Sequence, residues 1–448
     1  MTQDRNSLSG RVKRYAKVTT RMAGVGARLA GEKYLGVKSN RQQSAIELRV
    51  ALGGLKGPLM KVAQLLSTIP DLVPPEYAAE LAQLQADAPA MGWPFVKRRM
   101  AAELGLDWEK KFKSFDRDAF AAASLGQVHG AVTLDGRQIV CKLQYPDMQS
   151  AVAADLQQLK ILMAVFERYD RAVSTGKVQQ EIGARLNEEL DYQLEAKHIK
   201  LYRKMLHDVS DVDVPEVIDR LSTKRLLCMS RLEGTRFVEA VNRGQRERNA
   251  IATHMFHAWY VPFYNYGVIH GDPHMGNYTV RADNGINLLD FGCVRIFSPG
   301  VVGGVIRLYH ALTDNDSDAA VAAYESLGFV KPSKALIDIL NVWARFIYAP
   351  ILEDRARLIE ETNSGVYGRA TARKVHEELR KLGKIEVPRE FVFMDRAAVG
   401  LGSVFLKLRA EINWYRIFHG LIDGFDVKKL TQMQAKALKA VDLALPAA

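Results

Sequence analysis

The sequence contains little cysteine and has no long apolar run. Its three cysteines are Cys141, Cys228 and Cys293. They are far apart and form no C-x-x-C pair, which argues against a disulfide framework or a structural zinc site and favours a reducing compartment. No stretch approaches the roughly 20 uncharged apolar residues that a membrane-spanning helix needs. The first residues also lack the apolar core of a secretory signal, so neither integration into a membrane nor export is expected.

The remaining composition is that of an ordinary globular protein. Of 448 residues, 48% are apolar and 25% are charged. A chain of this length can form two or three domains, each with its own core. No metal or disulfide is needed to stabilise such domains.

The formal net charge is +11, and much of it lies in residues 1–40, which carry nine basic and two acidic residues. Apolar side chains recur there at steps of three and four residues, which predicts an amphipathic helix with a basic face. Such a segment suits an anionic lipid surface. A solvated helix packed on the main body and an organellar transit peptide are the alternatives. Nucleic acid is not expected as a partner, because no binding motif accompanies the charge.

The most informative stretch is His270–Asn277, which is followed by Leu288–Gly292. Asn277 comes five residues after Asp272, and Asp290 comes thirteen residues after Asn277. Protein kinases space their catalytic Asp, metal-binding Asn and DFG Asp in this manner. The intervening residues predict a strand, an Asn-Gly turn and a second strand. This loop should bring Asp272, Asn277 and Asp290 to one place, where they would hold Mg²⁺ and orient an attacking group.

The same stretch also permits a different kind of site. His270, His274 and Asp272 could ligate zinc or iron, and a lone histidine can simply be a packed core residue. The oxygen ligands that follow match Mg²⁺ better than a transition metal.

A second kinase-like pattern begins near residue 115, where the periodicity becomes that of strands. Residues 121–128 fit the glycine-rich template G-x-G-x-x-G-x-V, except that Ala121 and Ala123 replace its first two glycines. Asp135-Gly136 predicts a hairpin turn. The following stretch, residues 139–142, matches the V-A-I-K strand, whose lysine (here Lys142) contacts the α- and β-phosphates.

A long helix is predicted over residues 177–206. It carries four acidic residues that are candidates to pair with Lys142, since a buried phosphate-binding lysine needs a carboxylate to position it. These are Glu188, Glu189, Asp191 and Glu195. A strand over 225–230 should lead into the segment that joins two lobes, and the chain after Asp290 should be mostly helical.

Together these motifs resemble the UbiB/AarF family of atypical kinases, which includes the coenzyme Q biosynthesis kinases. Five segments carry the resemblance. They are Lys61-Val62-Ala63-Gln64, similar to the family's K-x-G-Q; the alanine-rich residues 121–124; Glu189-Leu190-Asp191 with Glu195; His270–Asn277; and Asp290-Phe291-Gly292.

The resemblance implies an α+β, bilobal protein-kinase-like fold with a helical N-terminal extension and a mainly helical C-lobe. The expected divisions are a basic segment (1–40), an extension carrying Lys61 and Gln64 (41–114), an N-lobe (115–232) and a C-lobe (233–448).

The resemblance also implies roles for individual residues. Lys142 would pair with Glu195, Asp272 would be the catalytic aspartate, and Asn277 with Asp290 would hold Mg²⁺. Lys61 and Gln64 would approach the active site and meet Glu189 or Asp191, with His270 in the catalytic loop. The nucleotide would contact Ala121, Ala122, Ala123, Ser124, Gly126, Val128, Lys142 and, in the hinge-like stretch, Met229.

The implied activity is that of an ATP- and Mg²⁺-binding ATPase or phosphotransferase that supports quinone or isoprenoid-lipid metabolism. Its partners would be a nucleotide, an anionic membrane surface or lipid precursor, and a biosynthetic complex. It would be cytoplasmic and peripheral at the inner membrane, or in the mitochondrial matrix of a eukaryote. The alternatives are a small-molecule phosphotransferase of the aminoglycoside or choline kinase type, and a pseudokinase scaffold.

The sequence departs from related patterns at three positions. Ala63 replaces the glycine of K-x-G-Q, and Ser230 stands where the family often has glutamate. Gly271 stands where classical kinases have the arginine that contacts a phosphorylated activation loop. Control through an activation loop is therefore not expected.

Overall fold

The computed structural model describes residues 91–446, apart from residue 124, several positions in 147–157, and residues 158–182, 362–367 and 383–386. The basic segment, Lys61, Gln64 and Ser124 therefore lie outside the described residues. So does the first part of the predicted helix over 177–206. What was predicted for these residues stays a prediction.

The described residues form two compact units. One contains the residues up to Tyr192 together with Asp219–Cys228, and the other contains Gln193–Ile218 and Met229 onward. These units follow spatial contacts rather than the domain limits predicted from the sequence, which stay predictions.

A five-stranded sheet forms the core of the first unit. Its order is β1-β3-β4-β6, with β2 paired to β3. The strands are β1 (Phe112–Phe115), β2 (Ala121–Ala123), β3 (Gly126–Thr133), β4 (Gln138–Gln144) and β6 (Leu226–Ser230), beside α5 (Trp93–Leu104) and the 3-10 turns η2 (Trp108–Lys111) and η3 (Asp219–Leu221). The predicted hairpin turn is confirmed: Gly136 has φ 85°, a conformation that glycine adopts without steric cost. It joins β3 and β4, which pair antiparallel.

Two smaller sheets lie in the second unit. One has the order β5-β10-β9-β7 and the other pairs β11 with β8. The strands are β5 (Val212–Asp213), β7 (Thr235–Arg236), β8 (Val268–His270), β9 (Tyr278–Val280), β10 (Ile286–Leu288) and β11 (Val294–Ile296). The strand–turn–strand predicted between Asn277 and Asp290 is confirmed as the antiparallel pair β9–β10.

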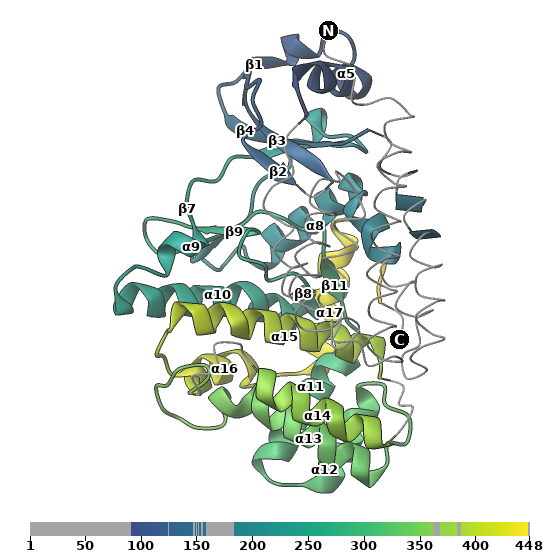
Figure 1. The fold of residues 1–448 in the computed structure, drawn as a ribbon, viewed down its shortest axis with the longest axis vertical. Helices are drawn as coiled ribbons and strands as arrows, with labels where there is room; N and C mark the ends of the chain where they lie inside the picture. The colour runs from purple at the N-terminus through teal and green to yellow at the C-terminus, as the bar shows by residue number, and fades with distance from the viewer. Residues whose placement is uncertain are drawn as a thin grey trace, which may run out of the picture. The chain divides into compact units, whose positions relative to one another are not determined.

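Helices make up most of the second unit (Figure 1). They are α8 (Tyr192–Met205), which begins at the last residue of the first unit, α9 (Phe237–Ala240), α10 (Gln245–Tyr266), α11 (Pro299–Thr313), α12 (Ser317–Ser326), α13 (Lys334–Tyr348), the 3-10 turn η4 (Ala349–Ile351), α14 (Arg369–Leu382), α15 (Arg389–Leu408), α16 (Trp414–Ile422) and α17 (Val427–Lys439). In Figure 1, α10 runs beside α15, and the two helices are in contact. Gly267 ends α10 in the left-handed conformation, with φ 65°, which glycine adopts without steric cost. A Cβ atom there would also lie 2.5 Å from the Gln434 amide nitrogen.

The prediction of one continuous helix over 177–206 was wrong. The helix that includes residues 183–189 ends in a turn at Leu190, and α8 starts at Tyr192. The carbonyl oxygen of Leu190 accepts a hydrogen bond from the Gln144 side chain at 3.0 Å. The Leu190 carbonyl oxygen thus bonds to a side chain of the sheet instead of to an N–H of the next helical turn.

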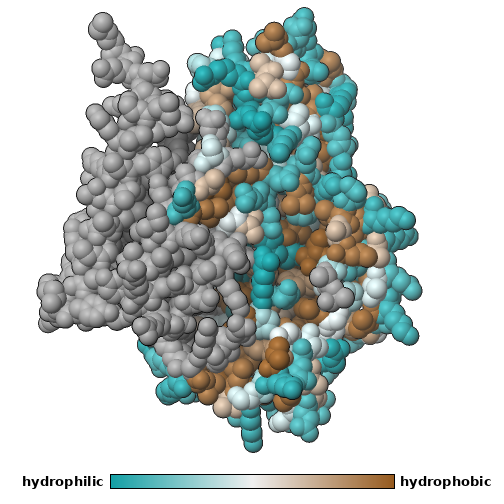
Figure 2. Space-filling view, turned by 90° about the vertical axis from the view of Figure 1, so that its right-hand side faces the viewer, coloured by the Kyte–Doolittle hydropathy of each residue, from teal (hydrophilic) through white to brown (hydrophobic). Residues whose placement is uncertain are grey.

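Within the part of the chain that the structure describes, no helix is both long and apolar enough to span a membrane. Apolar side chains do reach the surface in patches among hydrophilic ones (Figure 2). Among the exposed apolar residues are Val330, Val342 and Val392.

Candidate active site

The predicted catalytic loop leaves strand β8 at His270 and is held by neighbouring elements. The indole Nε1 of Trp259, on α10, donates to the His270 carbonyl oxygen at 3.0 Å. The Tyr278 hydroxyl donates to the Pro273 carbonyl oxygen at 3.1 Å. The backbone N–H of Gly271 donates to the Cys293 carbonyl oxygen at 2.7 Å. Both ends of the loop are therefore fixed from buried positions.

His270 links the two predicted acidic residues. Its Nδ1 accepts the backbone N–H of Asp272 at 3.3 Å, and its Nε2 lies 2.6 Å from the Asp290 carbonyl oxygen. Since a carbonyl only accepts, Nε2 carries the proton and the imidazole is neutral. His270 is 1% exposed. Both ring nitrogens are thus engaged in positioning backbone, which removes His270 as a metal ligand.

Asn277 and Asp272 are in direct contact. The Asn277 Nδ2 donates to the Asp272 carboxylate Oδ2 at 3.1 Å and to the Asp272 carbonyl oxygen at 3.0 Å. Because the nitrogen faces Asp272, the amide oxygen Oδ1 is the atom of Asn277 that a cation would meet. The structure therefore brings these two predicted site residues together.

Helix α8 holds the segment that carries Asp290. The backbone N–H of Phe291 lies 3.5 Å from the Glu195 carboxylate, and the Phe291 carbonyl oxygen lies 3.0 Å from Nδ1 of His198. Asp290 itself accepts the Gly292 N–H at 3.0 Å. His198 was not predicted, although its position three residues after Glu195 places it on the same helix face.

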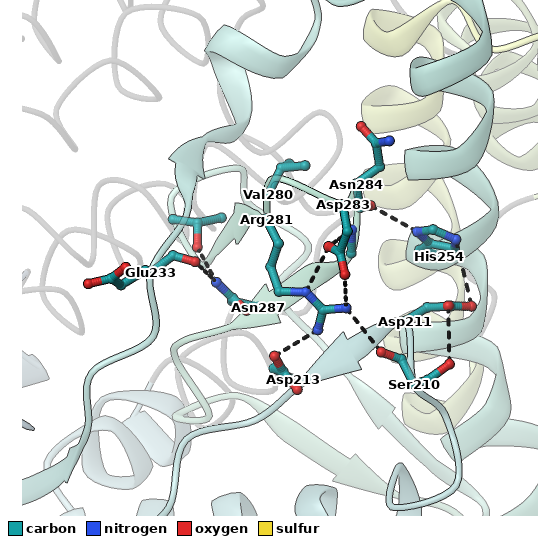
Figure 3. Close-up of polar contacts among 12 residues, drawn as sticks. Ser210, Asp211, Asp213, Glu233, His254, Val280, Arg281, Asp283, Asn284 and Asn287 are labelled. Atoms are coloured by element: carbon teal, nitrogen blue, oxygen red, sulfur yellow. Dashed lines mark hydrogen bonds and ion pairs between the residues drawn. The ribbon is translucent and has the colours of Figure 1, made fainter. Parts of the chain in front are cut away.

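The far end of the β9–β10 hairpin is anchored by Arg281 (Figure 3). Its guanidinium lies 2.7 Å from the Asp213 carboxylate, donates to the Ser210 carbonyl oxygen at 3.0 Å, and contacts Asp283 through two 3.0 Å hydrogen bonds. The Arg281 hydrogen bonds hold the pKa of the Asp283 carboxyl at about 2. This bidentate geometry fixes the turn of the hairpin.

Helix α10 and the segment before it form hydrogen bonds to the same turn. Nδ1 of His254 donates to the Asn284 carbonyl oxygen at 2.8 Å, as Figure 3 shows. Arg243 donates to the Asn284 side-chain oxygen at 2.8 Å and to the Arg281 carbonyl oxygen at 3.1 Å. Asn284 has φ 70°, as an Asn-Gly turn requires. Because the turn is fixed, the opposite end of the hairpin presents Asn277 and Asp290 at defined positions.

In the first unit, the predicted nucleotide loop is the β2–β3 hairpin. Ala121 pairs with Val128, Ala122 with Gln127 and Ala123 with Gly126. Only glycine fits at position 126, since a Cβ atom there would lie 2.4 Å from the Leu143 carbonyl oxygen.

Lys142 lies on β4 directly across from Val128. It is 7% exposed, and its Nζ is 5.3 Å from the centre of the Tyr192 ring. Glu195 belongs to the other unit, so the predicted pairing of Lys142 with Glu195 stays a prediction.

Two buried polar residues beside this loop were not predicted. The backbone N–H of Met91 donates to the Gln127 side-chain oxygen at 2.7 Å. The Gln127 side-chain nitrogen donates to the Met91 carbonyl oxygen at 3.1 Å and to Nε2 of His129 at 2.8 Å. Nδ1 of His129 donates to the Asp116 carbonyl oxygen at 2.8 Å. Burial lowers the pKa of His129, which favours the neutral form of the ring. The strand alternation of residues 126–133 would have marked only their burial.

The remaining predicted residues are placed as follows. Glu189 and Asp191 are half-buried around the turn at Leu190, and Met229 is buried on β6. The side chains of Ala122 and Ala123 lie outside the described part of the chain.

The donor set fits Mg²⁺ better than a transition metal. Asp290 would supply a carboxylate and Asn277 an amide oxygen. Within the described ranges, no group of three histidine, cysteine or acidic side chains could hold a metal alone. Mg²⁺ is usually bound through one or two carboxylates plus substrate phosphates and water, which agrees with this incomplete set.

Comparison with known proteins gives consistent relatives. The chloroplastic Arabidopsis thaliana protein ACTIVITY OF BC1 COMPLEX KINASE 7 is 29% identical over 67% of this chain and 44% of its own length. The mitochondrial atypical kinase coq-8 of Caenorhabditis elegans is 30% identical over 70% of this chain and 42% of its own. The chain thus spans about half the length of such curated relatives.

A solved structure agrees with these relatives. The structure of Rv3197 from Mycobacterium tuberculosis in complex with erythromycin is 27% identical, with a TM-score of 0.60, and the match covers 86% of this chain and 96% of that one. The model of the ABC1 atypical kinase-like domain matches residues 83–324. The predicted α+β kinase-like fold is confirmed, and the chain belongs to the ABC1 atypical kinase-like family.

Proposed function

We propose that this chain binds ATP with Mg²⁺ and hydrolyses it or transfers its phosphoryl group, in support of quinone or isoprenoid-lipid metabolism at a membrane surface. The observation that carries the proposal is the contact between Asn277 and Asp272, with His270 linking the loop to Asp290. In kinase-like enzymes catalysis consists mainly of positioning and charge stabilisation, and these residues are rigidly positioned.

Four residues of the second unit have distinct roles in the proposal. Asp272 orients the attacking hydroxyl or water and accepts its proton. The Asn277 amide oxygen and the Asp290 carboxylate hold Mg²⁺, which neutralises charge on the phosphates. His270, neutral and bonded at both nitrogens, keeps the distance between Asp272 and Asp290 fixed.

Most of the proposed nucleotide contacts come from the first unit, whereas Glu195 and Met229 belong to the second. Lys142 binds the α- and β-phosphates, and Glu195 positions it. The β2–β3 hairpin (Ala121 to Val128) covers the phosphates, and Met229 contacts the base. Lys61 and Gln64 approach the site and meet Glu189 or Asp191.

The membrane role rests on the basic residues 1–40 and on the family. Relatives of this chain are named mitochondrial or chloroplastic. For this chain we propose a peripheral location at a membrane carrying anionic lipid, within a biosynthetic complex. Deletion of residues 1–40 tests this part by itself: liposome binding should fall, and unaltered binding contradicts the lipid-surface role.

The catalytic proposal is tested by ATP hydrolysis with wild type and Asp290→Asn, with and without anionic liposomes and phenolic lipid precursors. We expect turnover in the wild type and a loss of about 100-fold or more in the variant, since a charge that holds the metal is gone. The matched control is Asp318→Asn, which changes an exposed carboxylate on α12 and should leave turnover unchanged.

The outcomes separate the alternatives. Stoichiometric phosphorylation of a soluble alcohol would identify a small-molecule phosphotransferase. Nucleotide binding without turnover under every condition, together with full biological function of Asp290→Asn, would identify a pseudokinase scaffold and overturn the proposal.

A further inference from the structure

A cavity of about 120 Å³ lies within the second unit, and neither Asp272 nor Asp290 lines it. Helices α10, α11, α13, α15 and α16 line it, and aromatic side chains contribute much of the wall. These include Tyr260, Tyr264, Trp343, Tyr348, Trp414 and Phe418. The cavity shares no residue with the predicted nucleotide or metal contacts.

The aromatic rings of the wall support one another. Tyr260 and Tyr264 are stacked, with ring centres 5.9 Å apart. Phe418 meets Tyr264 edge to face at 5.7 Å. The Tyr348 hydroxyl is engaged with the Val305 carbonyl oxygen at 3.0 Å. Aromatic rings attract cations at their faces through their quadrupoles.

One carboxylate enters this aromatic box. Asp395, on α15, is the only lining residue among those described that can carry a full charge at neutral pH. It accepts a hydrogen bond from Nε1 of Trp343, on α13. No arginine, lysine or histidine of the described chain pairs with it. Only desolvation and the hydrogen bond from Trp343 shift its pKa. Burial raises its pKa to about 6, so it is mostly ionised at pH 7.5.

Asp395 is half-buried, and the apolar wall of the cavity takes part of the water away from its carboxylate. An ionised acid in apolar surroundings is stabilised by an opposite charge. Aromatic faces add to the attraction for organic ammonium groups. A cavity of roughly 150 Å³ accepts a benzene-sized molecule, so about 120 Å³ holds no more than one ring, and a charged group on that ring would lie at the partly exposed edge beside Asp395.

From this combination we infer that the cavity is a binding site for a small organic ammonium with an apolar, single-ring body, whose cation pairs with Asp395. The site is independent of the proposed nucleotide chemistry. It does share elements with the catalytic loop: Ile269, which lines the cavity, precedes His270, and Gly400 of α15 packs against Pro273.

The test compares three probes at pH 7.5 on the full chain by ligand-observed NMR titration. Benzylammonium carries the charge, ethylbenzene has the same shape without it, and phenol is a neutral hydrogen-bond donor. We expect benzylammonium to bind about tenfold more tightly than ethylbenzene, from the ion pair and the cation–π contacts. In Asp395→Asn the two affinities should become equal.

Asp338→Asn is the matched control, because it removes an exposed carboxylate from α13 that does not line the cavity. It should keep the wild-type preference. Ala398→Leu, which narrows the cavity and keeps Asp395, should weaken benzylammonium and ethylbenzene alike. Thermal unfolding shows that each variant is folded.

Three results overturn the inference: no binding of any probe, equal binding of benzylammonium and ethylbenzene to the wild type, or a preference that survives in Asp395→Asn. Tighter binding of phenol than of benzylammonium would also overturn it, in favour of a neutral ligand. None of these results depends on whether the protein turns over ATP.

Discussion

The side-chain nitrogen of Asn277 donates to both the carboxylate and the backbone carbonyl of Asp272, at 3.1 and 3.0 Å. One amide therefore contacts the predicted catalytic residue twice and, in the proposed site, would offer its oxygen to Mg²⁺. Because of this double role, turnover should be sensitive to replacing the amide nitrogen of Asn277 with an oxygen.

Replacement Asn277→Asp should abolish turnover. The new carboxylate would accept where the amide donates and would repel Asp272, so we expect ATP hydrolysis to fall about 100-fold or more. Steady-state ATPase kinetics measure this. Asn242→Asp, at an exposed position, is the control and should retain wild-type turnover. An active Asn277→Asp enzyme would contradict the assigned role of the amide.

Gly400→Ala should disturb the catalytic loop, because Gly400 packs against Pro273 although the two residues are far apart in the sequence. A Cβ atom at this position would lie 2.5 Å from Cγ of Pro273, so helix or loop must move. We expect a loss of about 1–3 kcal/mol in unfolding free energy and a fall in turnover of about tenfold.

Gly420→Ala provides the matched comparison for this prediction. Nothing lies within 4 Å of a Cβ atom there, in helix α16. It should stabilise the protein by up to about 1 kcal/mol, because alanine has the higher helix propensity. Chemical denaturation distinguishes the two variants, and equal effects would refute the steric argument.

Asp395→Asn should alter how stability depends on pH. The carboxyl has a pKa of about 6 in the folded state against a usual 3.8, so the folded state binds more protons between these values. Wild-type stability should thus fall as pH rises from about 4 to 6, by about 1–3 kcal/mol. Asparagine cannot ionise, so the Tm of the variant minus that of the wild type should rise from pH 4 to pH 7. A pH-independent difference would contradict this.

The buried thiols should resist modification. Cys141 and Cys228 are fully buried on neighbouring strands, with their sulfurs 3.3 Å apart. Burial, with Cys141 beside it, raises the pKa of Cys228 well above its ordinary value. Iodoacetamide at pH 8 should label the partly exposed Cys293 and leave the other two until the protein is unfolded. Mass spectrometry after brief labelling decides this, and fast native labelling of Cys228 would disagree with the structure.

Local patterns predicted local geometry well. The turns at Asp135-Gly136 and Asn284-Gly285 follow from residues that tolerate positive φ, and the spacing from Asp272 to Asp290 matched a hairpin of the right length. The family was also recognisable, because its motifs are short, ordered and chemically specific.

What the sequence could not predict depends on contacts between distant residues. At the break at Leu190, the carbonyl oxygen is bonded to Gln144, which is 46 positions earlier, and no local signal opposed a longer helix. The bond from His198 to Phe291 spans 93 positions. The cavity around Asp395 requires five helices at once, whereas the sequence alone shows only an acid in an apolar segment.

The contacts of Glu195 and His198 with Phe291 have a consequence for how this family can vary. Both are made to the main chain of Phe291, so no exchange of the residue at 291, short of proline, can remove either bonding group. Mutation can change this attachment chiefly from the helix side. Differences in how tightly the segment that carries Asp290 is held should therefore arise from substitutions at positions 195 and 198.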